Sequence, residues 1–171
     1  MKYSLIAALV ALAVPSALCA QNIELTLDQT LVENFDGTAA EEAFASYQAT
    51  TTKHIKDDGT LSFDFAFPEG LKGNAEPMAC TDEAAHTGCT GLFITATFTL
   101  PEGKTAAQIV DLVNGFNTTH RAGQLVYAAD GTSRMGYFLS ADFGITKTNL
   151  AVQIFRFRRT AGAWAAQIYA K

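Results

Sequence analysis

The chain has 171 residues, a formal net charge of −5 and a hydrophobic content of 49%. A chain of this length buries on the order of 70% of its unfolded surface, which is enough for one domain with one core. The acidic charge excludes nucleic acid and anionic membrane surfaces as expected partners, because binding to either requires a patch of lysine and arginine.

The first 20 residues have the pattern of a secretory signal peptide. Lys2 supplies one positive charge, Leu5–Val14 is an apolar run, and the small residue Ala20 precedes a polar one. The apolar run is much shorter than the roughly 20 residues of a membrane-spanning helix, so we expect no stable insertion into a membrane. We predict a signal peptide at residues 1–20, cleaved after Ala20, and therefore a periplasmic or secreted protein.

An alternative for this segment is a lipoprotein signal that leads to acylation of Cys19. Leu18 stands against it, because a small residue is wanted at that position. Cleavage after Ala20 removes only Lys2 among the charged residues, so residues 21–171 form the predicted single domain with a net charge of −6.

The first third of this domain predicts a short helix and a hairpin. Thr38-Ala-Ala-Glu41 has the form of a capping box that opens a helix through about Gln48. Two β-rich runs follow at 50–56 and 60–67, and Asp57-Asp58-Gly59 between them is typical of a tight turn. The second run alternates apolar and polar residues, so one of its faces is expected in the core.

The middle of the chain predicts one long strand and one helix. Residues 68–89 have no clear pattern, whereas the continuous β-propensity of 91–100 suggests an interior strand covered on both faces, or nearly so. Thr105-Ala-Ala-Gln108 forms a second capping box. Apolar residues recur at helical spacing after it, which predicts a helix to about Thr119.

The last third predicts a second hairpin and a long helix. The hairpin joins 124–127 to 135–139 through Asp130-Gly131, and the helix begins near Thr148. Gly162 predicts a kink or an early end in this helix. The order α-β-β-β-α-β-β-α predicts an α+β fold, with an antiparallel sheet of about five strands and three helices mostly on one face.

Two cysteines, Cys80 and Cys89, remain after removal of the signal segment. An even pair in an exported protein favours a disulfide. The alternatives are a redox-active pair and a zinc site built from Cys80, His86, Cys89 and an acid. The spacing is unusual for structural zinc, and an oxidising compartment disfavours the thiolates that zinc needs. We predict a disulfide, with no metal and no cofactor.

Several short motifs resemble the YbjN-domain family, which is described as a group of bacterial sensory transduction regulators. They are Asn114-Gly-Phe-Asn117 followed by Arg121 and Gly131, and Phe143-Gly-Ile-Thr146 followed by Asn149-Leu150. The exported branch of the family is similar in placing two cysteines before an aromatic strand. The resemblance covers about residues 40–170. It implies a fold like that of type III secretion chaperones and, by analogy with them, a homodimer.

Candidate functional residues lie around the end of the second helix. Asn114 and Asn117 share a helix face; they either cap the helix end or form the polar rim of a binding groove. In the second reading a groove suited to a peptide or a partner helix is lined by aromatic residues and Arg121. The predicted aromatic members are Phe116, Tyr127, Tyr137 and Phe143.

An enzyme would need a nucleophile beside a base, paired carboxylates or a ligand cluster. His54, His86 and His120 lie on a predicted strand, a loop and a helix end, and no motif links them. We therefore predict a non-enzymatic module that binds a protein, peptide or small ligand. The alternatives are a small periplasmic hydrolase and a structural envelope protein without a ligand.

Overall fold

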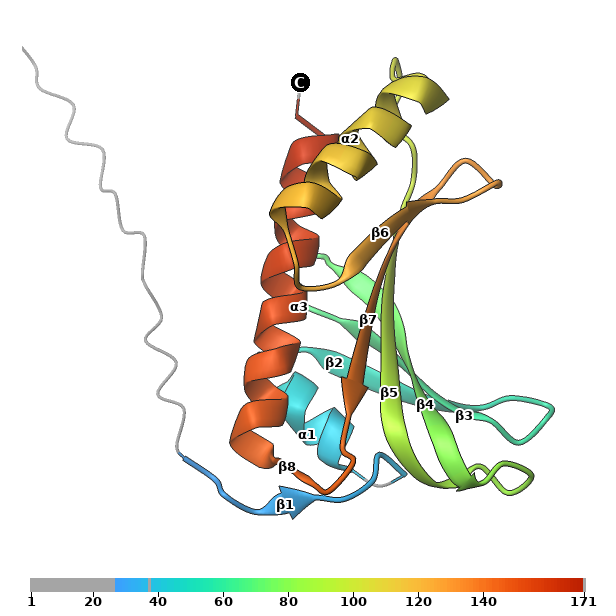
Figure 1. Cartoon of the computed structure of the whole chain (residues 1–171), viewed down its shortest axis with the longest axis vertical. Helices are drawn as coiled ribbons and strands as arrows, with labels where there is room; N and C mark the ends of the chain where they lie inside the picture. The colour runs from blue at the N-terminus through green and yellow to red at the C-terminus, as the bar shows by residue number, and fades with distance from the viewer. Residues whose placement is uncertain (1–26, 37, 171) are drawn as a thin grey trace, which may run out of the picture.

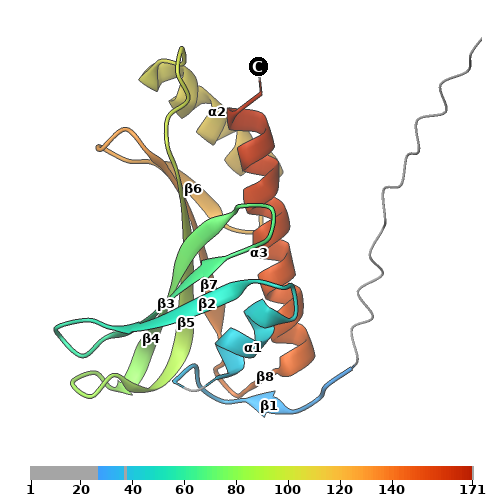
Figure 2. The ribbon, with the colours of Figure 1, turned by 180° about the vertical axis from the view of Figure 1, so that it is seen from behind.

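A six-stranded antiparallel sheet with three helices on one of its faces makes up most of the structure (Figures 1 and 2). The computed structural model describes residues 27–36 and 38–170, so the predicted signal peptide lies outside the described residues. The strand order is β2-β3-β4-β5-β7-β6, and a separate two-stranded sheet pairs β1 with β8. The predicted α+β class with an antiparallel sheet is confirmed, and the sheet has one strand more than expected.

The elements follow the chain in the order β1 (Leu31–Val32), α1 (Ala39–Ala45), β2 (Thr50–Ile55), β3 (Leu61–Ala66), β4 (Lys72–Asp82), β5 (Thr87–Phe98), α2 (Ala106–Thr119), β6 (Gln124–Tyr127), β7 (Ser133–Ser140), β8 (Ile145–Thr146) and α3 (Lys147–Ile168).

Helix α3 is the central helix of the core. It lies along the sheet, with α1 beside its N-terminal half and α2 beside its C-terminal half (Figure 1). Its buried stripe recurs every three or four residues, as expected for an amphipathic helix, and comprises Leu150, Ala151, Ile154, Phe157, Thr160, Ala161, Trp164 and Ile168. Gly162 lies on the exposed side, and α3 continues past it to Ile168, so the early end that Gly162 suggested does not occur.

Of the two predicted capping boxes, one is confirmed and the other is wrong. Thr105 and Gln108 form the expected capping box on α2. The Thr38 side chain makes no capping bond to the backbone of α1, because Thr38 adopts the helical conformation itself and its hydroxyl donates to the Glu42 carboxylate. Helix α1 ends at Ala45, earlier than predicted, because the chain turns there and Gln48 adopts a positive φ of 60°.

The segment predicted to be irregular, 68–89, contains strand β4 and the start of β5. Gly73, Asn74 and Pro77 weaken the β pattern of this segment. Pro77 is tolerated because β3 pairs with β4 only as far as Ala75, so the missing N–H interrupts no ladder bond on that side. Pairing with β5 along most of its length therefore makes β4 a strand.

Strand β5 has only one fully covered face. Leu92, Ile94 and Ala96 are buried against the helices, whereas Phe93 and Thr97 on the other face are exposed. The expectation that this strand is covered on both faces was wrong, because all three helices lie on the same side of the sheet (Figure 2).

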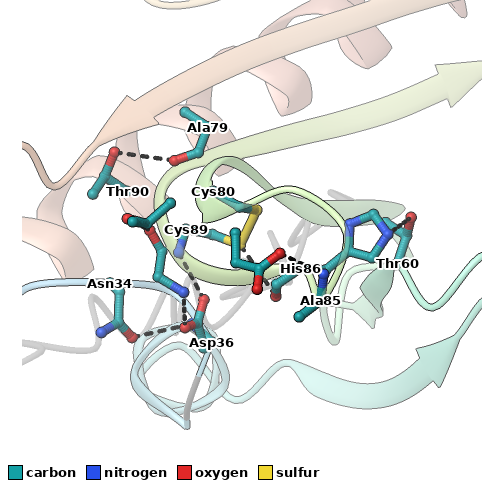
Figure 3. Close-up of a disulfide and its surroundings, with 12 residues drawn as sticks. Asn34, Asp36, Thr60, Ala79, Cys80, Ala85, His86, Cys89 and Thr90 are labelled. Carbon is teal, nitrogen blue, oxygen red and sulfur yellow. Dashed lines mark hydrogen bonds between the residues drawn. A yellow bond between two sulfur atoms is a disulfide. The ribbon is translucent and has the colours of Figure 1, made fainter.

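The predicted disulfide joins Cys80 and Cys89, which are direct partners in the β4–β5 ladder. The hairpin tip that it closes holds two other segments in place (Figure 3). The Asp36 carboxylate accepts hydrogen bonds from the backbone N–H groups of Gly88 and Cys89, the latter at 2.9 Å. His86 Nε2 lies 3.1 Å from the Asp58 carbonyl oxygen in the β2–β3 turn. The disulfide thus lies at a junction of three loops.

Candidate binding surface

The face of the sheet without helices, here called the open face, carries two neighbouring aromatic side chains. Phe93 on β5 and Phe138 on β7 are direct ladder partners, with 37% and 53% of their surface exposed. They point away from the core because Leu92, Ile94 and Leu139, next to them in the chain, point into it. The strand alternation therefore places an aromatic pair in solvent.

Two glycines let these rings lie close to the backbone. A methyl group at Gly136 would be 2.9 Å from the Phe93 ring, and one at Gly91 would be 2.8 Å from the Phe138 ring. Each ring thus covers a glycine on the neighbouring strand. This arrangement compensates for the destabilising effect of glycine in a sheet. The rings are held in place while their outer faces stay accessible.

Beside this pair the open face contains a hollow of about 670 Å³. Its lining includes Phe93, Arg121, Gln124, Val126, Arg134 and Phe138, and we call it the open-face hollow. Val126 on β6 is 47% exposed and extends the apolar surface. The hollow is therefore apolar at its base and bordered by two arginines.

The two arginines differ in their partners. Arg134 forms a salt bridge with Asp130, whose pKa is lowered by hydrogen bonds from Thr132 and by Arg134. Arg121 is exposed and forms no salt bridge with any residue that the structure describes. The hollow can thus offer a guanidinium group to an anion next to an apolar surface.

A second hollow, of about 530 Å³, lies near the turn between β7 and β8. It is lined by Glu33, Thr90, Ala141, Asp142, Phe143 and Gly144. The Phe143 side chain is fully exposed, and its φ of +65° lies in the left-handed region. The charged side chains here, Glu33 and Asp142, are acidic, whereas those of the open-face hollow are basic.

The predicted groove residues are distributed over several places. Phe116 is 2% exposed and packs edge-on against Trp164 in the core. Tyr137 is half-buried, contacts Phe157 and donates a hydrogen bond to Gln153, although it also borders the open-face hollow. Phe143 lies in the turn after the C-terminal end of β7, at the second hollow.

The remaining three residues lie near the end of α2 and on β6. Asn117 hydrogen-bonds the backbone of Leu125, Asn114 is exposed, and Tyr127 is half-buried. Of the seven predicted residues, the structure brings only Arg121 and Tyr137 to one hollow.

Sequence reasoning missed Phe93, Val126, Arg134 and Phe138 as surface residues. The signal was present in the glycines: Gly91 and Gly136 interrupt strands otherwise rich in β-formers, which marks a close approach by another group. It could not be interpreted without the strand pairing, because each glycine is covered by a ring from the neighbouring strand.

The histidines are separate from one another. His54 Nε2 lies 2.9 Å from Asp64, His86 contacts the β2–β3 turn, and the His120 ring stacks on Phe116 with centroids 3.8 Å apart. In residues 27–36 and 38–170, no three His, Cys, Asp or Glu side chains are grouped as metal ligands. Within the same residues no helix has both the length and the apolarity needed to cross a bilayer.

Comparison of the chain with protein-family models, with curated proteins and with solved structures finds no match.

Proposed function

We propose that the chain is a non-enzymatic binding module of an exported protein, similar to the YbjN type, and that the open-face hollow recognises a protein or peptide partner. The observation that carries the proposal is the exposed Phe93–Phe138 pair beside Arg121. The partner segment has an aromatic or large aliphatic side chain with a carboxylate next to it.

The apolar part of the hollow provides a modest driving force. A partner that covers the exposed parts of both rings would bury about 180 Å² of apolar surface, which is worth roughly 4 kcal/mol. Association itself costs several kcal/mol. We therefore expect weak, reversible binding, with dissociation constants well above 1 µM.

The arginines provide the selectivity. The chain as a whole is acidic, so an acidic partner is repelled everywhere except near a local positive group. Arg121 is exposed and can form a bidentate pair with a carboxylate at the rim. Rim charges of this kind select the partner and its orientation more than they increase affinity.

Export is supported by the N-terminal sequence pattern and by the disulfide. The Cys80–Cys89 bond is the kind of cross-link that persists in oxidising compartments. Outside the cytoplasm no pool of reductant breaks the disulfide, so the loop junction around it keeps its shape.

The test uses fluorescently labelled nonapeptides with one central phenylalanine, flanked by glutamate, serine or lysine. We expect the glutamate peptide to bind best and the lysine peptide worst, measured by fluorescence anisotropy on the oxidised mature protein. Phe138→Ser should weaken binding of all peptides at least tenfold, and Arg121→Glu should reverse the charge preference.

The matched control is Val110→Ser, which removes an exposed apolar side chain from α2 instead of the open face. It should leave all three affinities unchanged. Equal binding of the three peptides, or undiminished binding by Phe138→Ser, would refute this function.

A further inference from the structure

The turn after β7, Ala141–Gly144, carries an aromatic residue where the backbone favours glycine. The Gly144 N–H donates to the Ala141 carbonyl at 2.8 Å, and Phe143 within the turn has a φ of +65°. A side chain with a Cβ is disfavoured there by contact with the backbone, and a bulky one is rare. Backbone strain of this kind is concentrated at functional sites.

No packing among the described residues compensates for this strain, because the Phe143 side chain is fully exposed. The nearby Leu31 side chain is 55% exposed and lies over Gly144, where an added methyl group would be 3.4 Å from it. The turn therefore presents an apolar projection to solvent, which we call the Phe143 knob (Asp142, Phe143 and Leu31).

The knob contains one acidic side chain and lies beside another. Asp142 hydrogen-bonds with Ser140 at 2.8 Å, and this bond and a further one from Thr90 lower the pKa of its carboxyl group. Glu33 borders the same part of the surface. An aromatic side chain beside carboxylates is the chemistry that the open-face hollow is proposed to recognise.

The knob and the open-face hollow are separate in this structure, because the Phe143 side chain is fully exposed and does not line the hollow. Arg134, which borders the hollow, lies six residues before Ser140, where β7 ends, and Phe143 lies in the turn that follows. At about 3.3 Å per residue, β7 spans about 20 Å from Arg134 to Ser140. Figure 1 shows β6 and the β7–β8 turn toward opposite ends of the sheet.

We propose that the Phe143 knob of one copy inserts into the open-face hollow of a second copy of this chain. The inference rests on the proposed function, since it names the partner of that site. The Phe143 ring covers the Phe93–Phe138 pair, and Asp142 pairs with Arg121 of the other molecule. The contact joins two different surfaces, so it propagates head to tail or closes into a ring.

The test is sedimentation equilibrium on the oxidised mature chain and on two variants. Phe143→Gly removes the knob, and Arg121→Glu combined with Phe138→Ser disables the hollow. The average molecular mass of the wild type should rise with protein concentration up to about 0.5 mM. Each variant alone should associate at least tenfold more weakly. Their equimolar mixture should form a 1:1 complex, because the intact hollow of one variant takes the intact knob of the other.

Controls separate loss of contact from loss of fold. Phe143→Gly should unfold at the same temperature as the wild type or higher, because glycine relieves the backbone strain. Val110→Ser should associate like the wild type. A wild type that stays monomeric, a Phe143→Gly variant that associates normally, or a mixture without the 1:1 complex would overturn the proposal.

Failure of this inference is distinguishable from failure of the proposed function. The Phe143→Gly variant keeps the hollow, so it should still bind the glutamate-flanked phenylalanine peptide. Peptide binding without self-association would refute only the second copy as partner. Absence of both would refute the binding module itself.

Discussion

The side-chain amide of Asn117 hydrogen-bonds both backbone groups of Leu125: its nitrogen donates to the Leu125 carbonyl at 2.8 Å, and its oxygen accepts from the Leu125 N–H at 2.9 Å. Strand β6 is the last strand of the sheet on this side. Asn117 thus takes the place of the missing neighbouring strand and protects this edge against pairing with another chain. Among the described residues, strand β2 at the other edge of the sheet pairs with β3 alone.

Asn117→Asp should destabilise the protein by about 1–3 kcal/mol at pH 7, because a carboxylate cannot donate to the Leu125 carbonyl. Urea unfolding measures the change. Asn114→Asp is the matched control, since Asn114 is exposed on the same helix and should change stability by less than about 0.5 kcal/mol. Equal losses in both variants would show that the helix, and not the Leu125 contact, is the cause.

Reduction of the Cys80–Cys89 bond should lower the free energy of unfolding by about 2.5–3 kcal/mol, the chain-entropy value for a loop of this length. The measurement compares urea unfolding with and without reductant. A Cys80→Ala, Cys89→Ala double variant should be insensitive to reductant. A loss below about 1 kcal/mol in the wild type would mean that the unfolded chain is not restricted by the cross-link.

Two glycine-to-alanine changes should act in opposite directions. Gly162 lies in α3 with open space around it, so alanine there should raise stability by about 0.5–1 kcal/mol. A methyl group at Gly73 would overlap the Thr95 carbonyl oxygen and the Phe65 ring, so alanine there should lower stability by about 3 kcal/mol or more. Thermal unfolding of both variants checks the pair, and a destabilised Gly162→Ala would contradict the helix environment described above.

Tyr47→Phe should raise stability by about 1 kcal/mol. The Tyr47 hydroxyl is buried without a hydrogen-bond partner among the described residues, and burial raises its pKa. Removing the hydroxyl ends that desolvation cost and keeps the ring contact with Phe155. Tyr169→Phe is the comparison, because the Tyr169 hydroxyl donates to the Thr99 carbonyl and its loss should not stabilise. A less stable Tyr47→Phe variant would indicate a bound water on that hydroxyl.

Patterns of a few neighbouring residues correctly predicted the hairpin turns, the cap of α2 and the buried face of β3. Gly59 and Gly131 adopt positive φ in the two expected hairpin turns, and Thr105 caps α2 as expected. The alternation in 61–67 placed Phe63 and Phe65 in the core correctly. In each case a few neighbouring residues carry the whole signal.

The features that the sequence did not predict depend on contacts between segments far apart in the chain. Strand β4 exists because β5 lies beside it, although its own residues favour an irregular segment. Phe116 was expected at a groove and lies in the core, because α2 packs against α3 at Trp164. The open-face hollow needs β5, β6 and β7 side by side, an arrangement that sequence spacing does not specify.

The protein contains one tryptophan, and its position gives the molecule a built-in optical reporter. The fully buried indole of Trp164 donates to Ser133 Oγ at 3.0 Å and contacts Phe116, so its fluorescence depends on α2, α3 and β7 staying packed together. The β4–β5 hairpin turn, which the disulfide closes, lies toward the other end of the sheet (Figure 1). Comparing the fluorescence transition with circular dichroism would therefore show whether the two ends of this fold melt as one unit.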